Sequence, residues 1–389
     1  MRWVLLRAFG PIETAWNEPL DVGETRCLAG AFDLVSRIAG RMGPEALGRE
    51  IGQEAADEWL RAYRLTAASN LQYAAFAGRL AGVAKMPGIP VAFLKGMALR
   101  LSGFVRLGWR AAGDIDLLVP PERLEELRAA LLAEGFVSSD LPGCEHQLPP
   151  LHHPSGMMVE LHRHIPGLRL DAGRGSATFH DLERAGLLER GAEVPEGSFV
   201  PAKTVLTGHC LVHGLVQHGL APESYPPFRT VADLVDLGFA GEAEAAPESF
   251  KLDRLDAEAV GTARDLVRGL REGFDPGMVV GDSPRSRLLR HFVVGAMDER
   301  YCEALKANPR YVLTVSEKPV PLAALSALFH ALFITRPEVD AIYGRQKSSA
   351  GYLFRQLMRP FDLVLRATRY SIQAVRTGLV HRAALRSKP

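Results

Sequence analysis

The sequence lacks several features that would assign it to a membrane or to an oxidising compartment. No run of about 18 or more apolar residues is free of charges, so a membrane-spanning helix is not expected. The first residues contain no long apolar stretch followed by a cleavage site, which argues against a secretory leader. The four cysteines lie far apart and form no Cys-x-x-Cys pair, so we expect free, buried thiols. Together these absences predict a cytoplasmic protein.

The chain also lacks a net charge of either sign. Its 46 basic and 45 acidic residues leave a formal charge of +1, so there is no strong nucleic-acid signal. Apolar residues make up 47% of the chain and charged residues 23%, which is the balance of a globular protein and excludes a wholly disordered one. A chain of 389 residues is long enough for about two or three domains.

The charge is unevenly distributed along the chain. Residues 345–389 contain ten Lys or Arg and one acid, Asp362, so this segment carries +9 and the rest of the chain −8. Interleaved apolar residues predict an amphipathic basic helix over 346–389. Such a helix either docks on the chain's own acidic surface, which we favour, or contacts an anionic membrane surface or an acidic partner, which would make the protein membrane-peripheral.

Apolar periodicity predicts helices on both sides of a short α/β segment. Ala, Leu, Arg and Glu dominate residues 24–85, where Pro44 marks a helix start. Helical patterns return from 178 to about 340, with loops at 192–201 and 221–227. Between these regions we expect, in order, a strand at 91–94, a helix at 95–104, a strand at 114–119, a helix at 121–135 and a hairpin of 148–153 with 157–164.

Acidic residues are predicted to meet on neighbouring strands of this segment. Alternation along a strand places Asp114 and Asp116 on one face, and it likewise pairs Glu160 with His162. Adjacent carboxylates repel each other unless a cation lies between them, so Asp-x-Asp is a suitable clamp for Mg²⁺ or Mn²⁺ together with substrate phosphate oxygens. Glu160 would complete a two-metal site or act as a general base.

Residues near these acids are predicted to hold a triphosphate. Lys95 and Gly96 lie at a strand-to-helix turn, where glycine allows close backbone approach and the start of a helix binds anions. Arg110 offers a forked guanidinium to phosphate. His162 is either a phosphate-side group or an ordinary hydrogen-bonded histidine. The whole set suits in-line attack on a nucleoside triphosphate (NTP) with release of pyrophosphate.

An isolated Asp-x-Asp pair is most often a solvated strand edge, so the interpretation depends on the order of the whole set. The three segments that carry it are IPVAFLKG at 89–96, RAAGDIDLLV at 110–119 and VELH at 159–162. On these segments the chain resembles the uncharacterised nucleotidyltransferase family, over roughly residues 60–240. That family belongs to the DNA polymerase β-like nucleotidyltransferase superfamily.

The resemblance implies Mg²⁺-dependent transfer of a nucleoside monophosphate (NMP) to an acceptor. By resemblance, Asp114 and Asp116 match the metal-binding pair and Glu160 the third carboxylate. The wider superfamily usually has Gly-Ser or Gly-Gly where this chain has Lys95 and Gly96, so Lys95 would replace the serine hydroxyl that meets the triphosphate. The acceptor is expected to be a small molecule, a peptide or a saccharide.

Together the patterns and the resemblance predict an α+β, or mixed α/β, fold in which a small mixed sheet is flanked by extensive helical regions. We expect four parts, namely an N-terminal helical region at 1–86, the nucleotidyltransferase core at 87–200, a helical domain at 201–345 and the basic helix at 346–389.

Two alternative functions are left open by the sequence. The first is a catalytically inactive module of the same fold that binds a nucleotide or a partner protein. The second is a zinc hydrolase that uses the clustered histidines at 146, 152, 153, 162 and 164. His152 and His153 are adjacent in a strand, however, and point to opposite faces. His209 and His213 share one face of a predicted helix, where packing is favoured over contact with a nucleotide or acceptor.

Overall fold

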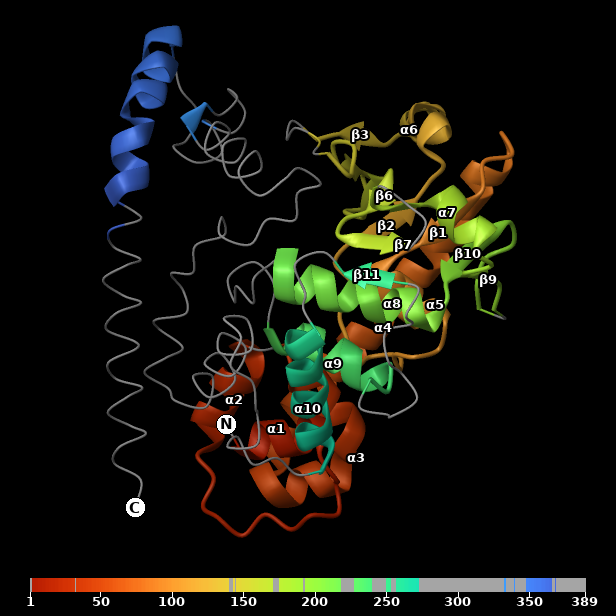
Figure 1. Ribbon diagram of the computed structural model, residues 1–389. Helices are drawn as coiled ribbons and strands as arrows, with labels where there is room; N and C mark the ends of the chain where they lie inside the picture. The colour runs from red at the N-terminus through yellow and green to blue at the C-terminus, as the bar shows by residue number, and fades with distance from the viewer. Residues whose placement is uncertain are drawn as a thin grey trace.

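The structure of this protein is a computed structural model, shown in Figure 1. It describes residues 2–31, 33–139, 143, 145–170, 175–191, 193–217, 227–239, 250–252, 257–272, 332–333, 339, 348–365 and 368. Most of the helical pattern predicted after residue 272, the predicted loop up to residue 226 and most of the basic tail after residue 365 lie outside these ranges.

The first helices of the chain pack around two buried tryptophans. These helices, with two later ones that share their core, are α1 (Arg2–Phe9), α2 (Val22–Ala31), α3 (Val35–Ile51), α4 (Gln53–Lys85), α9 (Pro227–Asp236) and α10 (Ala257–Glu272). Trp3 and Trp59 meet edge to face with their ring centroids 5.9 Å apart. In Figure 1 these helices form the lower part of the molecule, and α4 runs from them to the sheet.

The helix start predicted at Pro44 is confirmed. α3 consists of two helical segments joined at Gly43, whose φ of 72° and ψ of 174° are not helical, and Pro44 opens the second segment. Proline suits this position because an N–H in the first turn has no partner within the helix.

A seven-stranded mixed sheet forms the upper part of the molecule (Figure 1). Its strands are β1 (Val91–Phe93), β2 (Ile115–Leu118), β3 (Val137–Ser138), β4 (Leu151–His152), β5 (Met158–His162), β9 (Leu188–Glu189) and β10 (Ser198–Pro201). Their order is β3-β4-β5-β2-β1-β10-β9, with parallel pairs at β1–β10 and β2–β5 and antiparallel pairs elsewhere. The predicted fold class is confirmed, whereas the domain boundaries at 86, 200 and 345 stay predictions.

The centre of the sheet agrees with the sequence prediction. β1, β2 and β5 fall within the predicted strands, and β4 pairs with β5 as the predicted antiparallel hairpin. α5 (Lys95–Leu101) connects β1 to β2, and η1 (Pro121–Arg123) with α6 (Leu124–Ala133) connects β2 to β3. The apolar residues of these strands share one core with α4 and α6, so the helices cover one face of the sheet.

The loop predicted at 192–201 is wrong in its last four residues. These residues form β10, which pairs with β1 and places Ser198 opposite Val91. β9 also lies where a helical pattern was predicted. β9 and β10 lack the apolar run between glycine and proline that marks β1 and β2, so no local pattern predicted them. The remaining elements up to residue 252 are β6 (His164–Ile165), β7 (Leu168–Leu170), β8 (Ala177–Thr178), α7 (Phe179–Arg184), α8 (Lys203–Leu211), a π-helix (Val212–Gln217) and β11 (Phe250–Leu252).

The described part of the basic tail is helical over residues 349–365, as predicted. It exposes Leu353, Phe354, Leu357 and Phe361. Whether the tail contacts the chain itself, a membrane or a partner stays a prediction. Among the described residues, every helix falls short of the length or the apolarity that crossing a bilayer requires.

The prediction of buried thiols is wrong for one cysteine. Cys27 is free and exposed on α2, where it falls on the solvent side of the helix. Cys210 is free and partly buried. Cys144 and Cys302 lie outside the described residues.

Candidate active site

The pairing of β2 with β5 brings two carboxylates together at the centre of the sheet. Asp116 lies opposite Glu160 in this parallel pair, so both side chains leave the sheet on the same face. His162 follows two residues later on that face. The side chains of Asp116 and His162 are 1% exposed and that of Glu160 is 15% exposed. Carboxylates buried to this degree need a cation or hydrogen-bond donors beside them.

Lys95 supplies the cation. Its Nζ lies 2.7 Å from Asp116 Oδ1 and 3.7 Å from Glu160 Oε2. The backbone of Lys95 has a φ of 46°, in the left-handed region that costs a residue with a Cβ about 1 kcal/mol or more. Burial disfavours the charged ammonium, but the charges of Asp116, Glu160 and Asp114 together outweigh burial and raise the pKa of Lys95 above its ordinary value. Lys95 is therefore a fixed positive charge at the site.

His162 joins the same cluster through its Nε2 atom. This atom lies 2.8 Å from Asp116 Oδ1 and 3.5 Å from Glu160 Oε2. Burial alone would lower the pKa of His162, but the hydrogen bonds to the two carboxylates raise it. His162 Nδ1 is buried and has no hydrogen-bond partner among the described residues. His146 stacks on the ring at 5.6 Å between centroids, and burial lowers the pKa of His146 to about 3.

Asp114 stands beside this cluster rather than in it. One ligand atom from each of Asp116, Glu160 and His162 lies within 4.8 Å of the others, and Asp114 is not a member of that group. The charge of Asp116 and then burial raise the pKa of Asp114 to about 6. Burial would also raise the pKa of Asp116, but Lys95 and His162 hold it well below its ordinary value. The two aspartates of the motif therefore differ in environment, and their roles as metal ligands stay predictions.

Arg110 lies directly against Gly96. A Cβ at residue 96 would overlap the Arg110 guanidinium, which explains in steric terms why a glycine follows Lys95. Arg110 Nε lies 2.8 Å from Oδ1 of Asp233, a buried residue of α9. Burial raises the pKa of Asp233, and the charges of Arg110 and Arg229 oppose that rise. Arg110 is therefore anchored by a helix that lies more than a hundred residues further along the chain.

Two helices hold the loop that carries Arg110. From α4, Asn70 Nδ2 donates to the Arg110 carbonyl at 2.8 Å and Tyr73 Oη donates to the Gly113 carbonyl at 3.1 Å. From α9, Arg229 donates to the carbonyl of Ala111. The sequence analysis did not identify Asn70 or Asp233 as site residues. A signal existed for Asn70, because it shares the apolar face of its helix with Tyr73, where an amide needs a partner.

A family model described as uncharacterised nucleotidyltransferase matches residues 22–239, more than half of the chain. The protein belongs to this family. The match begins earlier than the resemblance over 60–240 predicted, and it takes in α2 and α3. Searches of curated proteins and of solved structures gave no match. The converging carboxylates, Lys95 and Arg110 thus lie within a nucleotidyltransferase unit.

The side chains that converge at this site fit a divalent cation. Asp116 and Glu160 supply the carboxylate oxygens that Mg²⁺ and Mn²⁺ prefer. His162 supplies an imidazole, which suits Mn²⁺ better than Mg²⁺ because Mg²⁺ prefers oxygen ligands. The excess of acidic groups over Lys95 leaves negative charge that a bound ion would neutralise. The donor set therefore supports a metal site built from two carboxylates and one histidine.

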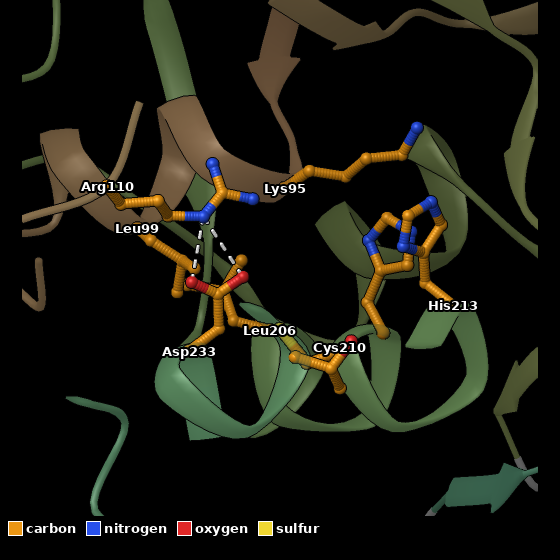
Figure 2. Close-up of a pocket in the computed structure, with 9 residues that line it drawn as sticks. Lys95, Leu99, Arg110, Leu206, Cys210, His213 and Asp233 are labelled. Atoms are coloured by element: carbon orange, nitrogen blue, oxygen red, sulfur yellow. Dashed lines mark hydrogen bonds and ion pairs between the residues drawn. The ribbon is translucent and has the colours of Figure 1, made fainter. Parts of the chain in front are cut away.

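A pocket opens between α5, α8 and α9 beside Lys95 (Figure 2). It encloses about 320 Å³ of empty space, part of it open to solvent, and is lined by Lys95, Leu99, Arg110, Leu206, His209, Cys210, His213, Thr230 and Asp233. The rings of His209 and His213 lie 5.8 Å apart, so they share a face as predicted. His209 Nε2 has no hydrogen-bond partner among the described residues, and burial lowers the pKa of His209 to about 3. Both histidines border the pocket, and their contact with a ligand stays a prediction.

The five clustered histidines do not converge on one point. His153 packs between Phe76 and Phe136, with ring centroids 5.2 and 5.0 Å away, and His152 is exposed. Among the described residues, the group that could hold a metal contains His162 together with two carboxylates. The geometry therefore favours a carboxylate-rich site over a zinc site made of histidines.

Proposed function

We propose that this protein is an active nucleotidyltransferase that moves an NMP group from an NTP to an acceptor, releases pyrophosphate and requires Mg²⁺ or Mn²⁺. The observation that carries the proposal is the convergence of Asp116, Glu160 and His162 beside Lys95 within a nucleotidyltransferase unit. Asp116, Glu160 and His162 would hold the metal. The bound ion would neutralise charge that develops on the phosphates.

The chain's own residues divide the remaining tasks. Lys95 and Arg110 bind phosphate oxygens of the NTP and orient the α-phosphorus toward the acceptor. Asp114 takes the proton of the acceptor hydroxyl at its carboxylate, because it stands beside the group that would hold the metal rather than in it. The acceptor oxygen then bonds to the α-phosphorus, the bond between the α-phosphorus and its bridging oxygen breaks, and pyrophosphate leaves.

The test uses the full chain, an extract that supplies acceptors, and NTPs labelled at either the α- or the γ-phosphate. We expect the α-label to appear in an acceptor and the γ-label in pyrophosphate, in the presence of Mg²⁺ or Mn²⁺. Asp116→Asn serves as the inactive variant and Asp57→Asn, on the exposed side of α4, as its matched control. Transfer that persists unchanged in Asp116→Asn contradicts the proposal, and the class of labelled acceptor identifies a small molecule, a peptide or a saccharide.

A second candidate is a catalytically inactive module that binds NTP. The ion pair of Lys95 with Asp116 favours it, because the ammonium already neutralises one of the carboxylates. This candidate predicts that NTP binds the chain while no pyrophosphate is released under any metal condition. The same labelling experiment therefore distinguishes the two functions.

We further propose that the reaction takes place in the cytoplasm. An NTP is an intracellular substrate, and Cys27 is free and exposed on the surface, as is typical of a reducing compartment. Fractionation of cells that produce the full chain tests this proposal and also shows whether the basic tail holds part of the protein at a membrane.

A further inference from the structure

Lys95 places a fixed positive charge between two carboxylates of the site. Its ammonium bridges Asp116 and Glu160 from adjacent strands, at 2.7 and 3.7 Å. Two-metal sites hold their ions about 3.5–4 Å apart, and their ligands are shared carboxylates of this kind. The ammonium thus contacts the same oxygen atoms that a second ion would need.

We propose that the Lys95 ammonium permanently replaces one of the two divalent ions of a two-metal site, so that one metal ion binds with each NTP. This inference rests on the proposed nucleotidyltransferase function and concerns the composition of the same site. It differs from the role predicted from the sequence, in which Lys95 replaces a serine hydroxyl on the triphosphate.

The balance of charge at the site supports the binding of a single divalent metal ion. The group that would hold the metal has two carboxylates, Asp116 and Glu160. With the neighbouring Asp114 there are three carboxylates, so one divalent ion together with the ammonium places three positive charges against three negative ones. A second ion beside Lys95 would meet a fixed like charge at a distance of a few ångströms, where repulsion in a partly buried site is strong.

The backbone conformation of Lys95 indicates that its side chain is required at this position. A φ of 46° favours glycine, yet a lysine stands here and the glycine follows at residue 96. The strand before it is fixed, because the N–H of Leu94 donates to the carbonyl of Asp116 at 2.9 Å. Strain of this kind persists where the surrounding structure requires it and where the side chain has a task. Here the task is to hold the ammonium between the two carboxylates.

The ammonium has donors left for the same reaction. Of its three N–H groups, one donates to Asp116 at 2.7 Å, while Glu160 Oε2 lies 3.7 Å away as an ion-pair partner. Another N–H can donate to a phosphate oxygen of the NTP. Lys95 would then bridge the enzyme's carboxylates and the substrate, which is what a metal ion does at that position.

The test counts metal ions directly. Mn²⁺ binding to the full chain is measured by electron paramagnetic resonance in the presence of an NTP analogue with a non-hydrolysable α–β bond. We expect one Mn²⁺ per wild-type chain and one per Lys95→Arg chain, because arginine keeps the charge. In Lys95→Met we expect a second Mn²⁺, together with about 10- to 100-fold tighter Mn²⁺ binding when no nucleotide is present.

The controls separate this inference from the proposed function. Lys85→Met removes an exposed lysine and is expected to leave Mn²⁺ binding unchanged. Two ions on the wild-type chain, or unchanged Mn²⁺ affinity in a folded Lys95→Met, overturn the inference even when pyrophosphate release is observed. One ion on the wild-type chain without pyrophosphate release overturns the proposed function and leaves the ion count standing. The wild-type count decides the inference even where Lys95→Met does not fold.

Discussion

Two buried ion pairs in this protein have the same kinds of partner and opposite surroundings. In the helical region, Arg37 of α3 meets Asp236 of α9 through two hydrogen bonds of 2.7 Å each. Its Nε donates to the Ala8 carbonyl, and its guanidinium lies over the Trp109 ring. In the sheet region, Lys95 meets Asp116, which also accepts from His162.

The first pair is closed, since one cation meets one carboxylate and each guanidinium nitrogen has an acceptor. The second pair is open, because Glu160 and Asp114 add negative charge that Lys95 does not balance. A closed buried pair fixes two helices relative to each other and leaves no charge for a ligand. An open pair costs stability and creates affinity for a cation. The contrast separates a structural ion pair from a functional one without reference to sequence motifs.

The largest expected effect is on the open pair. Asp116→Asn should lower nucleotidyl transfer by about 10³-fold or more, because it removes a charge on which both the metal and Lys95 depend. Its free energy of unfolding should fall, but by less than in a variant that leaves a buried cation with no carboxylate, because Glu160 stays beside Lys95 and the loss of the Asp116 charge relieves repulsion between the carboxylates. Transfer rates and urea denaturation of the same preparation measure the effect on activity and the effect on stability. Loss of transfer together with a large loss of stability would contradict the distinction between a functional and a structural ion pair.

The closed pair should show the reverse pattern. Asp236→Ala leaves the Arg37 guanidinium buried without its partner, so the free energy of unfolding should fall by about 3–5 kcal/mol. Glu58→Ala breaks the exposed pair with Arg26 and should cost about 1 kcal/mol or less. Urea denaturation of the two variants makes the comparison. Equal losses would show that burial does not distinguish these pairs.

The charge excess at the open pair should be measurable as instability. Asp114→Asn should stabilise the metal-free protein at pH 7 by up to about 3 kcal/mol, because the pKa of Asp114 is about 6 in the folded protein against 3.8 for an ordinary aspartate. A raised carboxyl pKa means that the folded state binds the proton more tightly, so wild-type stability recovers as the pH falls from 6 toward 3.8. The difference between variant and wild type should therefore shrink over that range. Urea denaturation of both proteins at several pH values measures this difference in stability. A difference that does not change with pH would contradict the prediction.

The smallest expected effect concerns the pair that links the two regions. Asp233→Asn weakens the anchor of Arg110, so the KM for NTP should rise by about 10- to 100-fold, the value of a charge-assisted hydrogen bond. Because Arg110 stays in the chain, the pH dependence of kcat should not change. Steady-state kinetics separate KM from kcat. A fall in kcat with no change in KM would assign Asp233 a role other than positioning Arg110.

The sequence predicted the parts of the fold whose signal is local. β1, β2 and β5 have apolar runs bounded by glycine and proline, and the alternation of acids along them predicted which side chains meet. β10 was missed because a four-residue strand beside a proline- and glycine-rich loop has no periodicity of its own. Its place in the sheet depends on pairing with β1, which is a tertiary property.

For the candidate site, too, the sequence predicted only what local patterns encode. Glu160 and His162 follow from strand alternation, whereas the place of Lys95 between the carboxylates depends on an unusual backbone φ that no pattern encodes. Asp233 could not be assigned to Arg110 because the two are 123 residues apart and meet only after α9 packs on α8, which in turn contacts α5. The separation of Asp114 from the other acids likewise comes from its position just before the strand begins.

The ion pair between Arg37 and Asp236 spans 199 residues. A ribosome must therefore finish α9 before the guanidinium buried near the start of the chain finds its carboxylate, and the same helix delivers the acid that holds Arg110. Long-range closure of this kind is slow compared with the formation of local helices. Newly made chains would thus form both the Arg37 pair and the anchor of Arg110 only after α9 has been made.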